Sequence, residues 1–176
     1  MTSRKSDPLL TAGKIMTVLL MAITALVAML LVTLVPFLLF HKGDFAATVA
    51  AAGGSYVPAL MLTILVLASI ACVVMMAFHF FQLLGRLIDT VSQGDPFTNE
   101  NAQRLTRMGW IALIFQIASF PIAAMAVYLQ KFFPAEELSI DIDFSLTGVL
   151  LAIVLFILAR VFRHGAAMRE DLEGTV

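Results

Sequence analysis

The residues best suited to chemistry lie close together in one apolar segment, where Cys72, Met75, Met76 and His79 fall within eight positions. On a helix, Cys72, Met76 and His79 share one face. Soft sulfur ligands beside an imidazole suit Cu(I), and His79 could serve as an axial haem ligand. However, no second histidine lies at a matching depth, and methionine commonly fills apolar interfaces. We therefore predict no metal or cofactor, and keep haem or Cu(I) binding through His79 as a third hypothesis for function.

Ionisable residues are absent from the depths of the long apolar segments. No Asp, Glu, Lys or Arg lies far inside any of them, whereas ion pathways, proton relays and intramembrane hydrolases depend on such groups. Gln116 is the main polar side chain there, and we interpret it as an interhelical hydrogen-bonding residue. The single cysteine excludes an internal disulfide and a Cys-based zinc site. We predict that the chain is not an enzyme and has no catalytic residues.

The composition indicates a membrane protein. The 176 residues are 61% hydrophobic and 13% charged, and the apolar residues come in blocks too long for a soluble core. The net charge of −1 gives no reason to expect direct nucleic-acid binding. We predict one domain, residues 1–176, whose main partner is the lipid bilayer.

Four apolar blocks are long enough to cross a membrane, so the predicted fold is an all-α bundle of four transmembrane helices. The expected spans are about 15–40, 56–81, 109–131 and 144–162. The first block is about twice as long as the apolar region of a signal peptide, so we interpret it as a retained span. The connection between the first two spans is rich in Ala, Gly and Ser, which predicts a loop ending at Gly53-Gly54-Ser55.

The distribution of cations predicts the orientation. Positively charged residues collect on the cytoplasmic side of membrane proteins, which here predicts a multi-pass membrane protein with both termini in the cytoplasm. An acidic outer loop, Gln130 to Asp143, agrees with this topology. Lys42 and Lys131 lie outside, and the other nine of the eleven Lys and Arg residues lie inside: Arg4, Lys5, Lys14, Arg86, Arg104, Arg107, Arg160, Arg163 and Arg169.

The polar break between the second and third spans predicts a cytoplasmic helical hairpin over residues 82–108. Its first helix keeps an apolar stripe that includes Leu84, Leu87 and Val91. Gly94 is placed as the residue just after that helix, and Thr98 as the N-cap of the next one. After the fourth span, residues 163–176 form a tail in which Met168 and Leu172 continue a helical stripe. Helices 2, 3 and 4 are thus expected to extend into the cytoplasm.

Two of these cytoplasmic segments carry a family resemblance. The hairpin turn Gly94-Asp95-Pro96-Phe97-Thr98-Asn99-Glu100-Asn101 with Arg104-Leu105, and the tail from Val161 to Val176, resemble a family of small bacterial four-span membrane proteins of unknown function. Members of that family are commonly encoded beside a short helix-turn-helix regulator of the Cro/C1 type. The resemblance implies the four-span fold and such a regulator as partner, and it implies no catalytic or cofactor residues.

The apolar stripes must be buried either against each other or against a partner, and both interpretations stay open. Together with the resemblance, the second one predicts a partner-binding function. We expect the chain to bind or sequester a small helix-turn-helix transcription regulator at its cytoplasmic face, in response to a lipophilic or membrane-state signal. The alternative is a small transporter or channel-like protein for a hydrophobic compound, with Pro36 and Pro121 shaping a passage. The residues predicted to bind the partner are Leu84, Leu87, Val91, Phe97, Arg104, Leu105, Arg163, Met168, Arg169 and Leu172.

Small residues on the second span allow close helix contact, and this leaves two interpretations open. Ala68, Ala71 and Ala77 lie there with Ser69, and small side chains let helix backbones approach in a membrane. The contact is either packing within the bundle, which we prefer, or the seam of a homodimer.

Overall fold

The computed structural model describes residues 8–132 and 146–173. These residues form five helices and no strand: α1 (Pro8–Phe40), α2 (Lys42–Ala51), α3 (Tyr56–Ser92), α4 (Asn99–Leu129) and α5 (Leu146–Glu173). All except α2 are long and apolar enough to cross a membrane. The predicted all-α fold with four membrane-spanning helices is therefore confirmed, as expected for a multi-pass membrane protein.

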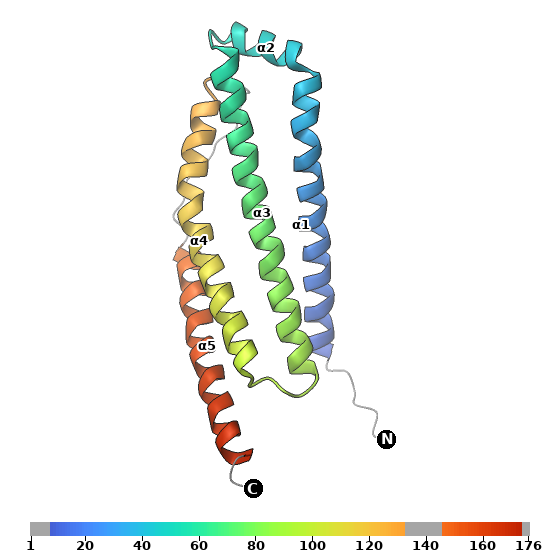
Figure 1. Cartoon of the computed structure of the whole chain (residues 1–176), viewed down its shortest axis with the longest axis vertical. Coiled ribbons are helices and arrows are strands. Elements are labelled where there is room, and N and C mark those ends of the chain that lie inside the picture. The colour runs from blue at the N-terminus through green and yellow to red at the C-terminus, as the bar shows by residue number, and fades with distance from the viewer. Residues whose placement is uncertain (1–7, 133–145, 174–176) are drawn as a thin grey trace.

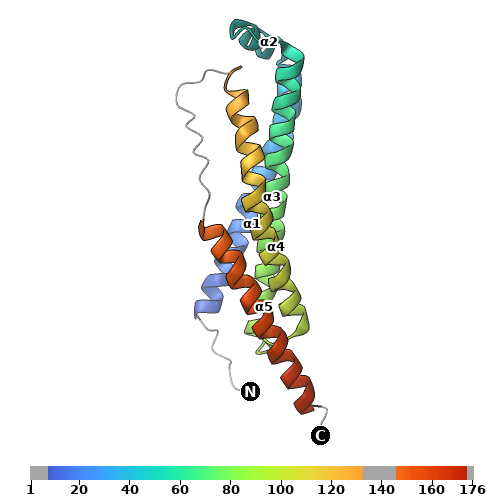
Figure 2. The same ribbon diagram turned by 90° about the vertical axis from the view of Figure 1, so that its left-hand side faces the viewer.

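The four long helices stand side by side in a row (Figures 1 and 2). In this row α1 packs on α3, α3 on α4, and α4 on α5, while within the described residues α1 packs on neither α4 nor α5. The start of α1, the turn between α3 and α4 and the end of α5 lie at one end of the molecule, which we call the turn end (Figure 1). The opposite end is crossed by α2.

The prediction of a loop between the first two spans is wrong over most of its length, because residues 42–51 form the helix α2. It lies across the end of the molecule between α1 and α3 (Figure 1). Alanine favours helix, and Asp44 in the first turn suits the helix dipole. Phe45 and Val49 are buried against Ala59 of α3. These two side chains form the apolar face that holds α2 in place.

Small residues hold α4 and α5 close together. On α5 Ala152, Ala159 and Ala166 recur every seven residues and are at most 3% exposed. On α4 a Cβ added at Gly109 would lie 2.9 Å from the ring of Phe156. This is the spacing of a coiled-coil seam built from small residues, which allows the close backbone approach that stabilises helix pairs in membranes. The main core cluster is completed by Leu83, Leu105, Met108, Ile111, Ala112 and Leu155.

The outer helix α1 packs on α3, and its most buried side chain and its ion pair to α3 lie near the turn end. Thr17, 3% exposed, lies against Gly85, and Lys14 forms an ion pair of 2.7 Å with Asp89. Farther along, α1 exposes large apolar side chains such as Leu26 and Met29, which is the surface expected of a helix in contact with lipid.

α5 is shifted along α4 towards the turn end. Gly148 lies against the Gln116 side chain at the middle of α4, and Phe156 lies against Gly109. α5 therefore begins about half-way along α4 and continues beyond the α3–α4 turn (Figures 1 and 2). The tail is helical as far as Glu173, which confirms the predicted helical extension. The start of the predicted fourth span and most of the acidic outer loop lie outside the described residues.

Candidate functional site: the hairpin–tail surface

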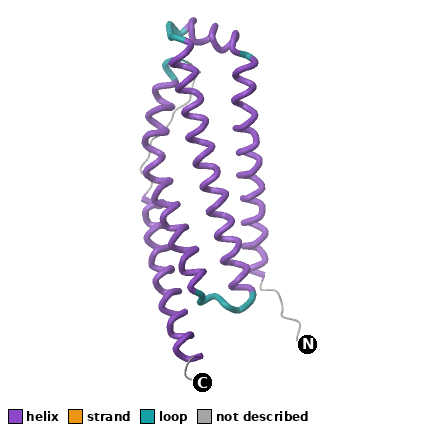
Figure 3. The backbone as a smooth tube through the Cα atoms, in the orientation of Figure 1, coloured by secondary structure: helices purple, strands orange, loops and turns teal. Residues whose placement is uncertain are grey.

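The α3–α4 turn has a geometry that its sequence specifies. Gly94 has φ of +86°, a conformation that glycine adopts at little cost. Its N–H donates to the carbonyl of Val91 at 3.0 Å, and the N–H of Asp95 donates to the carbonyl of Thr90 at 3.2 Å. These two bonds form a Schellman motif that ends α3, so the prediction for Gly94 is confirmed. Figure 3 shows the short connection that follows.

A buried polar network fixes the turn to both helices. The side chain of Thr98 accepts a hydrogen bond from the N–H of Asn101 at 3.2 Å, which confirms the predicted N-cap. Asn101 is 0% exposed and donates to Thr90 at 2.8 Å and to the carbonyl of Pro96 at 2.9 Å. Its side-chain oxygen accepts a bond of 2.7 Å from Arg104. One amide thus satisfies partners from α3, the turn and α4, which makes the turn a rigid platform.

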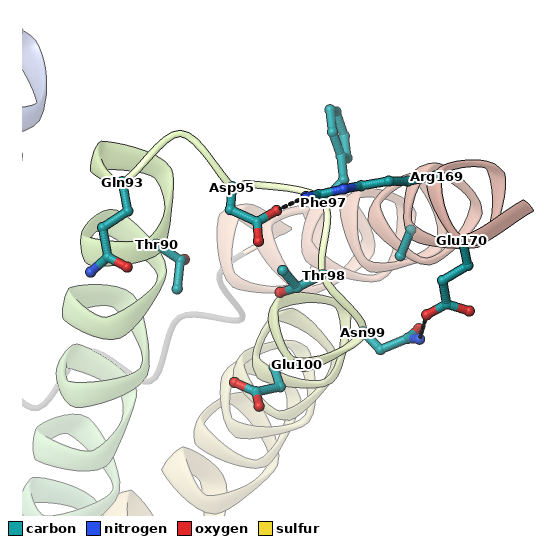
Figure 4. Close-up of a pocket in the computed structure, with 10 residues that line it drawn as sticks. Thr90, Gln93, Asp95, Phe97, Thr98, Asn99, Glu100, Arg169 and Glu170 are labelled. Atoms are coloured by element: carbon teal, nitrogen blue, oxygen red, sulfur yellow. Dashed lines mark hydrogen bonds and ion pairs between the residues drawn. The ribbon is translucent and has the colours of Figure 1, made fainter. Parts of the chain in front are cut away.

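The end of α5 docks on this platform through polar contacts. Arg169 pairs with Asp95 of the turn, and Asn99 donates to Glu170 at 3.0 Å. Figure 4 shows both contacts, with the carboxylates and the guanidinium lying across the space between α4 and α5. That space is a polar pocket of about 470 Å³ lined also by Thr90, Gln93 and Glu100.

An aromatic contact holds the same two segments together on another side. The ring of Phe97 lies 5.2 Å from that of Phe162. A Cβ added at Gly165 would lie 2.7 Å from the ring of Phe97, so any larger residue at this point of α5 would require that ring to move. We call the exposed face formed by the turn (residues 93–98), the first turn of α4 and residues 161–172 of α5 the hairpin–tail surface.

Five of the predicted partner-binding residues lie on this surface, among them Arg163 of the tail. Phe97, Met168 and Leu172 are 43%, 52% and 71% exposed. Arg169 is half-exposed and engaged with Asp95. These residues come from the turn and the tail, so two segments more than sixty positions apart in the sequence form one surface.

The other predicted residues are placed differently. Leu105 is 2% exposed, and Leu84 and Leu87 pack against the same core cluster, because the stripe on α3 is covered by α4. These three side chains stabilise the hairpin; Leu105 is not accessible to a partner in this structure, and Leu84 and Leu87 are only partly exposed. Arg104 is bound to Asn101 and to Glu100 at 3.0 Å.

Val91 and Arg163 also lie at the turn end. Val91 is half-buried near the end of α3. Arg163 is exposed on α5, and within the described residues it has no hydrogen bond or ion pair. Neither lines the polar pocket between the turn and the tail.

The structure places the candidate metal ligands of α3, Cys72, Met76 and His79, in different surroundings. Cys72 and His79 are exposed, and Met76 packs against the core cluster. Across the residues 8–132 and 146–173, no three His, Cys, Asp or Glu side chains converge as a metal site would require.

Sequence reasoning did not assign the residues that join the two segments. Asp95, Asn99, Asn101 and Glu170 were not among the predicted site residues, although the first three lie in the quoted turn. Their partners come from other helices, and a linear pattern does not identify such pairs. The opposite charges of Asp95 and Arg169 were the available signal.

Comparison with known proteins identifies the family. The chain matches the family described as "Protein of unknown function (DUF2975)" over residues 16–176, and it belongs to that family. No curated protein and no solved structure matches it.

Proposed function

We propose that this member of the DUF2975 family binds a small helix-turn-helix transcription regulator through the hairpin–tail surface and so holds it at the cytoplasmic face of the bacterial inner membrane. The supporting observation is that the hairpin turn and the tail, the two segments that carry the family resemblance, contact each other. Asp95 meets Arg169, and Phe97 meets Gly165. Residues brought together in this way can serve one common partner.

The composition of the surface favours a protein as that partner. Apolar Phe97, Met168 and Leu172 are exposed beside polar groups, an arrangement of apolar anchors with a polar rim that is typical of protein interfaces. The last turns of α5 also project beyond the other helices (Figure 1). A soluble protein can therefore approach them without meeting the rest of the bundle.

The charges at the turn end support the cytoplasmic orientation. The bias of Lys and Arg towards the cytoplasm sets the topology of most small membrane proteins. At the opposite end of the molecule the described cations are Lys42, the first residue of α2, and Lys131, which lies over the ring of Tyr128. The turn end carries Lys14, Arg86, Arg104, Arg107, Arg163 and Arg169.

Affinity purification from native membranes tests this proposal. The tagged protein is extracted in mild detergent, and the proteins that accompany it are identified by mass spectrometry. We expect a small helix-turn-helix protein with the wild type, and at least about a tenfold smaller amount with Met168→Glu combined with Leu172→Glu, because charging two exposed apolar anchors removes their contribution to binding.

A matched control is Leu9→Glu, which charges an apolar residue 77% exposed at the same end of the molecule but on α1. It should leave the amount of regulator unchanged. The proposal is rejected if the wild type brings down no helix-turn-helix protein, or if the double substitution retains as much of it as the control does.

A further inference from the structure

We propose that a groove along α5 binds one phospholipid with an anionic headgroup. This interfacial groove has apolar walls formed by Phe97, Ile157, Val161 and Met168, and Arg160 and His164 line it as well. Its volume is about 720 Å³, within the range of roughly 300–1,000 Å³ that is usual for small-molecule sites. The groove shares Phe97 and Met168 with the hairpin–tail surface, so a lipid and a regulator would compete for these two side chains. The lipid proposal is tested without a regulator protein.

The first argument is the level of the groove relative to the membrane. The apolar part of α4 begins at Met108, directly after Arg107, and Gly109 lies against Phe156 of α5. Because α4 and α5 run in opposite directions, Ile157 and Val161 stand level with the charged start of α4. They are 57% and 52% exposed, so α5 presents apolar surface at the depth of the lipid headgroups, where covering it is favourable.

The second argument is charge. Arg160 and His164 are one helical turn apart and exposed, and within the described residues neither forms a hydrogen bond or ion pair. No acidic residue lines the groove. A guanidinium and an imidazole are good hydrogen-bond donors to phosphate, and basic sites at the cytoplasmic level of membrane helices are the usual places for anionic headgroups.

The two arguments together select the occupant. A phospholipid of the adjacent leaflet has a phosphate and an acyl chain in one molecule, which matches the cationic rim and the apolar walls. A soluble phosphate compound would leave Ile157, Val161 and Met168 uncovered. A zwitterionic lipid such as phosphatidylcholine also has a phosphate, but its own choline offsets that charge, so it would pair with Arg160 less favourably than an anionic headgroup.

Trp110 provides a local reporter, because it is the only tryptophan and its ring lies 5.6 Å from that of Phe156, the residue that precedes Ile157 of the groove wall. The protein is reconstituted in phosphatidylcholine vesicles that contain a fixed fraction of brominated lipid, either phosphatidylglycerol or phosphatidylcholine. Quenching of Trp110 then measures how much of each lipid is nearby. We expect a roughly three- to tenfold enrichment of phosphatidylglycerol, as for one or two cations at a membrane surface.

Variants separate a specific site from general attraction to the surface. Arg160→Gln with His164→Gln should abolish the enrichment, and Arg86→Gln, which neutralises an exposed arginine of α3 at the same end, should preserve it. Val161→Phe keeps the charges but fills the groove, so it should also reduce the enrichment. Far-UV circular dichroism in vesicles verifies that each variant keeps its helices.

Equal quenching by the two lipids in the wild type would overturn the proposal. So would an enrichment that survives the double Gln substitution. An enrichment that survives Val161→Phe while the double Gln variant loses it would show attraction to the surface without a groove site, and would also overturn it.

Discussion

Replacing Asn101 by alanine is expected to destabilise the hairpin more than most substitutions beside a surface turn, because Asn101 is buried. Asn101 is 0% exposed, and the substitution leaves the carbonyl of Pro96 without its bond of 2.9 Å and Arg104 without its bond of 2.7 Å. Thr90 keeps a bond to Leu87. The carbonyl of Pro96 still accepts a hydrogen bond from the N–H of Thr98 at 3.1 Å, and Arg104 still pairs with Glu100. The substitution therefore removes buried hydrogen bonds without leaving either group fully unsatisfied, which predicts a loss of about 1–3 kcal/mol in the free energy of unfolding.

The assay is reversible unfolding in mixed micelles with increasing sodium dodecyl sulfate, followed by far-UV circular dichroism. Asn99→Ala is the matched control, because Asn99 is exposed and its bond to Glu170 is near the surface. It should cost less than about 1 kcal/mol. If the two alanine variants unfold at the same detergent fraction, the buried network does not fix the turn and the reasoning is refuted.

Two further predictions concern the contacts between helices. Gly109→Ala should cost about 1–3 kcal/mol of unfolding free energy, because the added methyl group would meet the ring of Phe156. The control Gly43→Ala, with open space around it, should be neutral or stabilising by less than about 1 kcal/mol. Equal effects of the two substitutions in the same unfolding assay would contradict the close α4–α5 contact. Lys14→Gln should cost less than about 1 kcal/mol, because its ion pair with Asp89 is half-exposed. That small effect should vanish in high salt. A larger or salt-independent loss would show that Lys14 does not act through a surface ion pair.

The parts of the fold that the sequence predicts well are those decided locally. Four helices follow from uninterrupted apolar length, because a backbone in lipid must satisfy its hydrogen bonds internally. Gly94 and Thr98 were predicted as the end and the start of helices because their roles depend on their own φ angle and hydroxyl group. Both act within a few residues of their position.

The parts that the sequence predicts poorly depend on tertiary contacts. α2 was missed because its helix is held by Phe45 and Val49 against α3, and composition alone favoured a loop. The α4–α5 seam was missed because Ala152, Ala159 and Ala166 lie within a segment that is apolar on every side, although their seven-residue spacing was visible.

The candidate site was predicted in part for the same reason. The exposed residues of the turn and tail, Phe97 and Met168, were recognised from helical stripes and family resemblance. The same pattern also selected Leu105, which is buried, because a stripe shows that a face is apolar and does not show which neighbour covers it. The pair of Asp95 with Arg169 depends on the shift of α5 along α4, which no local pattern records.

Photo-crosslinking in living cells tests the central claim most directly. Phe97 on the hairpin–tail surface is replaced by benzoyl-phenylalanine, and Phe37, 56% exposed near the opposite end of the molecule, serves as the matched position. We predict a crosslink to a small helix-turn-helix protein from position 97 and none from position 37. No such product from position 97, or the same product from both positions, would contradict binding of a regulator at the hairpin–tail surface.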